Sequence, residues 1–312
     1  MISQASHQLL LSGSKTVKNI LSIIKSKIKN YLFYFLSHRD VIFELQTYSE
    51  SKFFKIDPKK ISKILGENKI EIFDVGAAGG LKKITGFNKY KKNCNLTFVE
   101  PREDDSIEFF DDNSIRISKL IGRENGNGSL NITEDETKSS MLNPSGSYLH
   151  YWFGNQDGFR VKKTLSFEVT NIETVLKETK KNIDFLKLDT QGNELDILLG
   201  MGDCSPLFIQ TEVSFVPLYE SSSIFFELAN YLYKIGYVLF AQSYISGSTS
   251  KNKKKLKRIK SNAIPVHGDA WFMPDYTREE GKKIIYNRKK QYEALMLIYA
   301  MGDIANEALN EI

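Results

Sequence analysis

The sequence of 312 residues contains only two cysteines, Cys94 and Cys204, and they stand far apart, outside any C-x-x-C spacing. Neither a disulfide framework nor a cysteine-based zinc site is therefore predicted. A reducing cytoplasm fits this cysteine usage best. Internal repeats are also lacking, and low-complexity sequence is confined to 246–260, so a repeat architecture or a disordered chain is not indicated.

Long apolar runs are missing as well. The apolar-rich stretch 20–36 is interrupted by Lys25, Lys27 and Lys29, so no membrane-spanning helix is predicted. Residues 1–8 lack the basic region that opens a signal peptide, and we expect no such peptide. The predicted location is therefore the cytoplasm.

Basic charge is concentrated in two segments. Residues 1–60 hold ten basic and four acidic side chains, whereas 251–260 hold seven basic side chains and no acidic one. Because the formal net charge is +5, the rest of the chain carries about −8. We interpret 251–260 as a solvated loop, with contact to a polyanion or to an anionic membrane surface as the alternative.

An amphipathic helix is predicted over 16–37, because apolar residues recur there at helical spacing with lysines between them. We expect this helix to pack on the body of the protein or on a second subunit, in which case the protein is a homo-oligomer. The alternative is an interfacial helix peripheral to the inner face of the membrane.

Beyond the N-terminal segment, predicted strands and helices alternate along the chain. This alternation predicts an α/β fold with a doubly wound, mainly parallel sheet that has helices on both faces. We divide the chain into an N-terminal helical extension (1–60), a catalytic domain (61–275) and a C-terminal helical segment (276–312). Strands are expected at 70–75, 96–100, 115–118, 166–170, 184–189, 207–213, 237–241 and 270–273, and helices at 58–65, 102–111, 171–180, 193–200, 222–235 and 277–302.

A glycine-rich loop after the strand at 70–75 is the most informative local feature. Gly76 and Gly79 let backbone N–H groups approach a ligand without interference from a Cβ atom. Glu100 closes the next apolar run, and a carboxylate at the end of an adjacent strand can accept hydrogen bonds from both hydroxyls of a ribose. The loop and the acid together predict a nucleoside site.

The loop lacks the G-x-G-x-x-G pattern of dinucleotide enzymes. Ala78 stands where the second glycine would make room for a pyrophosphate, and Leu81 replaces the third. Asp74 would repel phosphates, but it suits the ammonium group of a methionyl moiety. We therefore infer S-adenosyl-L-methionine rather than NAD as the cofactor.

A longer segment resembles the FkbM-type, S-adenosylmethionine-dependent methyltransferases. Its most specific part is the polar phrase Lys187-Leu-Asp-Thr-Gln-Gly-Asn-Glu194, and the resemblance runs from Ile70 to Phe272. Thr190 departs from the usual pattern, in which valine or isoleucine is more common. The resemblance implies a seven-stranded Rossmann-like methyltransferase sheet and O-methylation of a hydroxyl on a sugar, a glycan precursor or a secondary metabolite. The matching positions imply cofactor contacts at Asp74, Gly76, Ala77, Gly79, Glu100, Pro101 and Asp189.

Methylation of a hydroxyl requires a positioned acceptor and a group that takes its proton. Asp189 is the first candidate for contacting the methionyl part or the acceptor, with a helix cap as the alternative role. Lys187 lies two residues earlier on the same face of the strand. Glu212 ends the next strand, and His267 is the candidate base because histidine titrates near neutral pH, with a structural role as its alternative.

A metal site is not assigned. Asp189, Glu212 and Asp269 carry oxygen ligands of the kind that Mg²⁺ prefers, but no compact spacing in the sequence joins them. Magnesium therefore stays a less favoured alternative.

The segment 138–163 follows neither a strand nor a helix period. It gathers His150 and aromatic side chains such as Tyr151, Trp152 and Phe153 between glycines and serines. Loops of this kind serve as lids or binding loops. We interpret the segment either as a lid over the site or as a plug at the edge of the sheet.

Two functions of other classes remain open. The first is a non-catalytic nucleoside-binding scaffold, against which the intact Asp74, Glu100 and Asp189 argue. The second is a nucleic-acid methyltransferase, which the basic tract would serve electrostatically. The body of the chain is acidic, however, and it lacks an Asn/Asp-Pro-Pro-Tyr-like segment. We therefore expect a small-molecule or glycan acceptor and no nucleic acid.

Overall fold

A computed structural model describes residues 53–77, 80–102, 114–147, 149, 156–243, 245–247 and 264–312. Residues from Lys52 to Ile312 form one compact unit. Several features expected from the sequence lie outside the described residues: the helix at 16–37, nearly all of the helix at 102–111, Gly79, the aromatic cluster of 150–153 and the basic tract 251–260.

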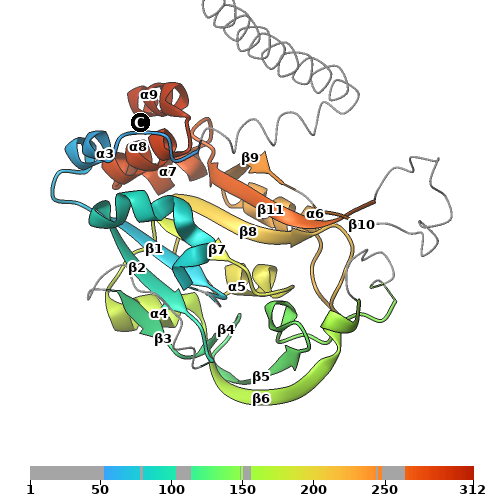
Figure 1. Cartoon of the computed structure of the whole chain (residues 1–312). Helices are drawn as coiled ribbons and strands as arrows, with labels where there is room; N and C mark the ends of the chain where they lie inside the picture. Colours follow the sequence, from blue (N-terminus) through green and yellow to red (C-terminus); the bar gives the residue numbers. More distant parts are fainter. Residues whose placement is uncertain are drawn as a thin grey trace, which may run out of the picture. The chain divides into compact units, whose positions relative to one another are not determined.

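The core of the unit is a mainly parallel sheet (Figure 1) with the strand order β10-β11-β8-β7-β1-β2-β3 and with β9 beside β11. Strands β3, β2, β1, β7 and β8 run parallel, and β11 is antiparallel to β8. The strands are β1 (Ile70–Val75), β2 (Cys94–Val99), β3 (Ile115–Ile117), β7 (Phe185–Leu188), β8 (Phe208–Ser214), β9 (Tyr237–Gln242), β10 (Ile245–Gly247) and β11 (Ile264–Pro274).

Strands β9 and β10 pair with successive parts of β11, so together they act as one interrupted edge strand. Counted in this way, the sheet of the described residues has seven positions, and the predicted fold class is confirmed. The central strands are buried on both faces, as expected for parallel strands covered by helices.

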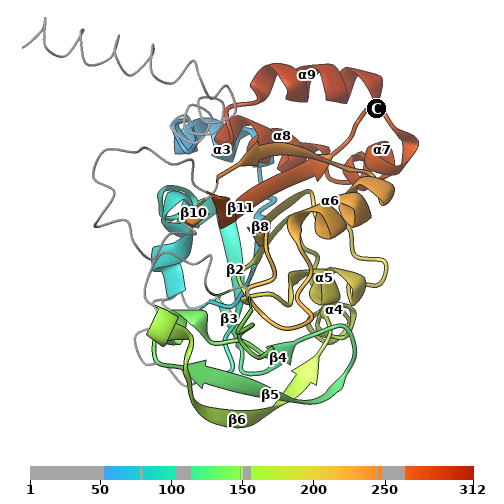
Figure 2. The ribbon, with the colours of Figure 1, turned by 90° about the vertical axis from the view of Figure 1, so that its right-hand side faces the viewer.

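Helices cover both faces of the sheet. In Figure 2, α4, α5 and α6 lie on one side, and η1 and α3 lie on the other. These elements are α3 (Pro58–Leu65), the 3₁₀ segment η1 (Gly80–Asn93), α4 (Ile172–Thr179), α5 (Glu194–Leu199) and α6 (Phe225–Lys234). The sequence predicted the four α-helices to within a few residues. Capping side chains mark the start of two of them: Asp57 accepts from the amide of Lys59 before α3, and Asn171 accepts from that of Thr174 before α4.

The C-terminal segment was expected to form one helix over 277–302, and this prediction is wrong. Three helices are present: α7 (Glu279–Tyr286), α8 (Lys289–Ile298) and α9 (Gly302–Glu311). Arg288 separates the first two, because its guanidinium donates to the carbonyl of Ile183 at 2.7 Å and to that of Ser205. Ala300 separates α8 from α9 with a left-handed φ of 62°.

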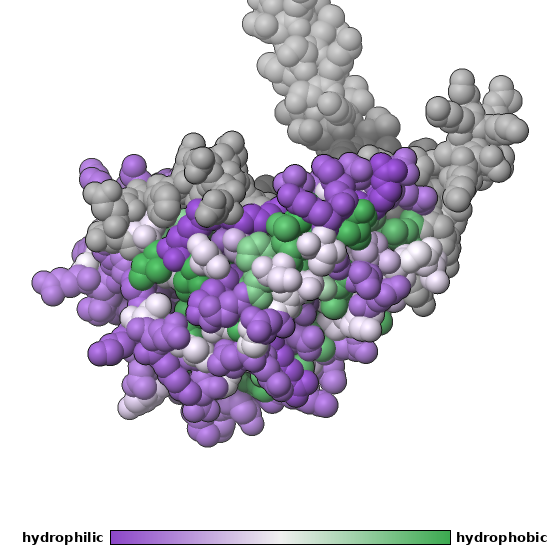
Figure 3. Space-filling view, turned by 90° about the horizontal axis from the view of Figure 1, so that it is seen from below, coloured by the Kyte–Doolittle hydropathy of each residue, from purple (hydrophilic) through white to green (hydrophobic). Residues whose placement is uncertain are grey.

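A second, three-stranded sheet lies beyond the carboxyl ends of the central strands. Its order is β4-β6-β5, with β4 (Leu120–Ile121), β5 (Gly126–Thr133) and β6 (Val161–Thr170). The strand expected at 166–170 is the end of β6, so it belongs to this sheet and not to the central one. Viewed from the side on which β5 and β6 lie, the surface is mostly hydrophilic (Figure 3). Most residues of β6 from Val161 to Glu168 are exposed.

Candidate active site

The candidate site lies where β1, β2 and β7 end side by side. The amides of Gly76 and Ala77 both donate to the carbonyl of Val99, at 3.1 and 3.2 Å, and the amide of Asp189 donates to that of Val75 at 3.0 Å. These bonds continue the ladder of the sheet past the last residue of each strand. The glycine loop and Asp189 are therefore held by backbone contacts at one edge of the sheet, where ligands bind in open α/β folds.

Gly76 is required by the geometry of this edge. Its φ is 80°, which L side chains rarely adopt, and a Cβ atom on it would lie 2.0 Å from the carbonyl oxygen of Asp189. The first glycine of the loop thus serves close packing between the ends of β1 and β7, as well as any approach to a ligand.

Asp74 and Lys187 form a buried ion pair. They are partners in the register of β1 and β7, and Lys187 Nζ lies 3.0 Å from Asp74 Oδ1 and 3.6 Å from Asp189 Oδ2. Only 1% of Asp74 and 4% of Lys187 is exposed. Burial alone would lower the pKa of Lys187, but Asp74 and Asp189 outweigh that effect, so the pKa is raised and the ammonium stays charged.

A cavity of about 580 Å³ opens beside the glycine loop. Of the predicted cofactor residues, Gly76, Glu100, Pro101 and Asp189 line it. Asp74 and Lys187 are not among its lining residues in the described part of the chain. The second sheet and the segment after it supply an apolar wall of Leu120, Ile121, Leu130 and Met141. Such a lining, apolar with a few polar groups, is typical of a small-molecule site.

Glu100 is held by Arg102 at this wall. The guanidinium approaches the carboxylate with both arms, Nε at 2.8 Å from Oε1 and Nη2 at 3.2 Å from Oε2, and the amide of Arg102 lies 3.0 Å from Oε1. Glu100 is 2% exposed, so its charge is compensated inside the protein. Sequence reasoning missed Arg102, although its place two residues after Glu100 was visible.

A second cavity of about 590 Å³ adjoins the first. Its lining shares Thr137, Asp189 and Gln191 with the first cavity and adds Lys138, Phe159, Glu212, Leu218 and His267. Asp189 therefore lies at the boundary of the two cavities, because it lines both of them. Four of the predicted cofactor residues line the first cavity, and the predicted acceptor residues Glu212 and His267 line the second.

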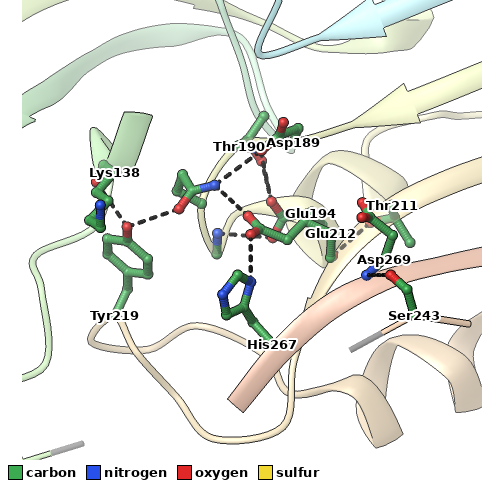
Figure 4. A network of polar contacts seen from close by, with 12 residues as sticks. Lys138, Asp189, Thr190, Glu194, Thr211, Glu212, Tyr219, Ser243, His267 and Asp269 are labelled. Carbon is green, nitrogen blue, oxygen red and sulfur yellow. Dashed lines mark hydrogen bonds and ion pairs between the residues drawn. The ribbon is translucent and has the colours of Figure 1, made fainter. Parts of the chain in front are cut away.

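Glu212 and His267 face each other across β8 and β11 (Figure 4), with Nδ1 of the histidine 3.1 Å from Oε1 of the glutamate. A carboxylate accepts hydrogen bonds, so this contact assigns the ring proton to Nδ1 and leaves Nε2 as the basic nitrogen. Burial lowers the pKa of His267, and the carboxylates of Asp269 and Asp189 offset part of that effect. The imidazole is therefore neutral near pH 7, as a base must be.

The chain matches a family profile described as the Methyltransferase FkbM domain over residues 74–239. The chain belongs to the FkbM methyltransferase family. This finding confirms the resemblance seen in the sequence. The match covers the residues that line the first cavity and all of those that line the second except His267. It identifies the protein as a methyltransferase.

Other comparisons add little. No curated protein matches this FkbM methyltransferase. Among solved structures, a precorrin-6y C5,15-methyltransferase from Geobacter metallireducens GS-15 aligns over 69% of this chain and 86% of its own, with 10% identity and a TM-score of 0.32. A TM-score of this size supports no conclusion. Within the described residues, no helix is long and apolar enough to cross a membrane.

Glu194 closes the loop between β7 and α5 of the FkbM methyltransferase. Its carboxylate accepts from the amide and the hydroxyl of Thr190, at 2.8 and 3.0 Å, and from the amide of Gly192 at 2.9 Å. Burial, followed by the charge of Glu212, raises the pKa of Glu194 to about 7. The amides of Thr190 and Gly192 are thus bonded to Glu194, and the alternative role of Asp189 as a cap of the following helix stays a prediction.

Asp269 lies next to Glu212 in the register of β8 and β11. Burial and the nearby charge of Asp189 raise the pKa of Asp269, whereas Lys187 lowers it. Among the described residues, no group of three or more histidine, cysteine or acidic side chains is arranged to hold a metal ion.

The described part of the segment 138–163 lies against the loop that follows β8. Pro144 forms a β-bridge with Tyr219, and the amide of Ser145 donates to the carbonyl of Leu218 at 2.8 Å. Phe159 is buried in a small apolar cluster with Leu218 and Tyr219. This contact brings Lys138 and Phe159 to the wall of the second cavity, and the unusual composition of the segment was the sequence signal for it. The lid or plug role of its other aromatics stays a prediction.

Proposed function

We propose that this methyltransferase moves a methyl group from S-adenosyl-L-methionine to a hydroxyl on a sugar, a glycan precursor or a related secondary metabolite. The observation that carries the proposal is the pair of adjoining cavities, one lined by the nucleoside-binding residues and the other by an acid and a histidine, which meet at Asp189. Transfer between two bound molecules requires two spaces that open onto each other.

The residues of the first cavity fit this cofactor. Glu100 offers a carboxylate to a ribose diol, Gly76 leaves room for close approach of the backbone, and the apolar wall at Leu130 and Met141 suits an adenine ring. The acids at the junction of the cavities, Asp189 and Glu212, favour a cationic sulfonium over a pyrophosphate. When bound, S-adenosyl-L-methionine supplies an activated methyl group.

The acceptor hydroxyl needs a base, and the contacts favour His267 over Asp189 in that role. Asp189 accepts from Gln191 at Oδ1, and Lys187 lies 3.6 Å from its Oδ2, so both of its oxygens are already stabilised as an anion. A carboxylate held in this way is a weak proton acceptor. His267 would take the proton of the acceptor hydroxyl during methyl transfer, and Glu212 would stabilise the resulting imidazolium.

Asp189 then has the role of positioning. It stands at the boundary of both cavities and carries a negative charge that two neighbours fix in place. From there it can accept a hydrogen bond from the acceptor or from the ammonium group of the methionyl moiety. The wall formed by Phe159 suits the face of a sugar ring.

Two measurements test the proposal. Calorimetry should detect binding of S-adenosyl-L-methionine and of its demethylated product but not of NAD; binding of NAD alone would refute the cofactor assignment. Mass spectrometry of surface glycans and small metabolites, from cells with and without the gene, should show one product lighter by a CH₂ unit in the deletion. The His267→Gln protein should fail to restore that product, whereas Glu124→Gln, at an exposed turn, should restore it.

A further inference from the structure

We propose that Gln191 is a positioning residue that keeps Asp189 and Glu212 ionised and fixed where the two cavities meet. The inference rests on the proposed function, because it concerns the same site, but it can be tested without a substrate. Gln191 lines both cavities and comes from the loop between β7 and α5.

The side chain of Gln191 joins the two acids through one nitrogen. Its Nε2 donates to Asp189 Oδ1 at 3.0 Å and also to Glu212 Oε2. A primary amide has two N–H groups, so each carboxylate receives one. The reverse orientation would place the amide oxygen against two anions, and it is excluded for that reason.

The other end of the amide is held as well. Tyr219 places its hydroxyl 3.1 Å from Gln191 Oε1, and the same hydroxyl lies 2.8 Å from the carbonyl of Lys138. Burial raises the pKa of Tyr219 well above its usual value, so the hydroxyl keeps its single proton, which the Lys138 carbonyl and Gln191 Oε1 share. The amide is therefore fixed at both ends, between the acids and the loop that follows β8.

The backbone of Gln191 has an unfavourable conformation that hydrogen bonds from neighbouring groups stabilise. Its φ is 59°, in the left-handed region that a glutamine adopts at a cost on the order of 1 kcal/mol. The buried hydroxyl of Ser140 donates to the Gln191 carbonyl at 2.7 Å, and Glu194 binds the amide of Gly192. This conformation turns the side chain back toward Glu212.

An uncharged hydrogen-bond donor is well suited to the space between the carboxylates of Asp189 and Glu212. The side chains of Asp189 and Glu212 are only 20% and 19% exposed, so their mutual repulsion is poorly screened by water. A lysine between them would cancel the negative charge that a sulfonium needs. The amide stabilises both anions and leaves their charge in place.

The contacts also connect the first cavity to the second through a series of side chains. Lys187 lies beside Asp189, Gln191 joins Asp189 to Glu212, and Glu212 holds His267 Nδ1. The orientation of the proposed base therefore depends on Gln191, although Gln191 does not touch it in any contact described above. Removing the amide leaves Glu212 with one donor fewer, so Glu212 should hold the ring proton of His267 more strongly.

The experiment is a titration of the histidine rings by nitrogen-15 NMR. The chain has four histidines, and the His267 signal is assigned by its loss in His267→Gln. In the wild-type protein, the neutral imidazole of His267 should carry its proton on Nδ1. In Gln191→Asn the backbone conformation is well tolerated, but the amide is too short to reach both acids, and the pKa of His267 should rise by roughly 0.5–1 unit.

Gln291→Asn is the matched control, because Gln291 lines a polar groove with Asn287 and Arg288, and it should leave the titration unchanged. A folded Gln191→Asn protein with the wild-type titration would overturn the proposal. Should that variant fail to fold, Tyr219→Phe removes only the hydroxyl that holds Oε1, and it should shift the pKa in the same direction by less; no shift there would also overturn it. Failure of S-adenosyl-L-methionine to bind would refute the proposed function. The histidine titration would still test the role of Gln191.

Discussion

The guanidinium of Arg102 binds both carboxylate oxygens of Glu100, with Nε 2.8 Å from Oε1 and Nη2 3.2 Å from Oε2. A ribose that binds Glu100 must share this carboxylate with Arg102 or displace it, because both bind the same oxygens. Cofactor affinity at this point is therefore the difference between two interactions. Arg102 is in this way a direct competitor of the ribose for the carboxylate.

Glu100→Ala should weaken binding of S-adenosyl-L-methionine by roughly 1.5–3 kcal/mol, the range for lost charge-assisted hydrogen bonds. Calorimetry measures the change directly. Glu134→Ala, at a carboxylate paired with Arg160 on the surface, should bind like the wild type. Equal affinities for the Glu100 variant and the wild type would mean that the ribose lies elsewhere.

Gly76→Ala should destabilise the fold by about 2 kcal/mol or more, since the new Cβ would lie 2.0 Å from the Asp189 carbonyl oxygen. Urea denaturation measures the loss. Gly126→Ala is the control, because a Cβ there meets nothing within 4 Å, and it should cost little. A Gly76 variant as stable as the control would show that the two strand ends move apart easily.

Asp189→Asn should keep the fold and lower turnover by about 10²-fold or more, because it preserves shape and removes the charge at the boundary of the cavities. The measurement is methyl transfer to any accepted substrate. Asp196→Asn, exposed on α5, should retain full activity. Wild-type turnover in Asp189→Asn would reduce Asp189 to a structural residue.

Glu194 should make the protein less stable as pH rises. Burial raises its pKa to about 7 in the folded protein, from an ordinary value of 4.5. The folded state therefore binds the proton more tightly than the unfolded chain does. The free energy of unfolding should therefore fall by up to about 3 kcal/mol between about pH 4.5 and pH 7. Urea denaturation across this range should give a flatter curve for Glu194→Gln; parallel curves would contradict the raised pKa.

The parts of the site that sequence could predict are local ones. Gly76 and Glu100 each end a strand, and a strand end with its periodicity can be recognised without knowing what lies beside it. The ion pair of Asp74 with Lys187 depends instead on the register between β1 and β7, which joins residues that are distant in the sequence. The role of Gln191 depends on a left-handed backbone angle in a non-glycine residue, for which the sequence carries no clear mark.

The missed elements have a similar cause. Strand β5 contains Gly126, Gly128 and two asparagines, so its β signal is weak, and pairing with β6 over its whole length stabilises it. The break between α7 and α8 comes from the carbonyls of Ile183 and Ser205, which lie just before β7 and β8 and bind Arg288. Helical periodicity continues through the break, and only the tertiary contacts end the helix.

The interruption between β9 and β10 falls opposite Gly268 and Asp269 of β11, directly after His267, which pairs with Ile245. There, the backbone of β11 is joined on its outer side to Ser243, whose hydroxyl accepts from the amide of Asp269 at 3.2 Å and whose amide donates to its carbonyl at 2.8 Å. Strands β1 and β7, by contrast, have paired neighbours on both sides. The proposed acceptor side of the site thus rests on an interrupted edge pairing, whereas the proposed cofactor side rests on strands that are paired along their length.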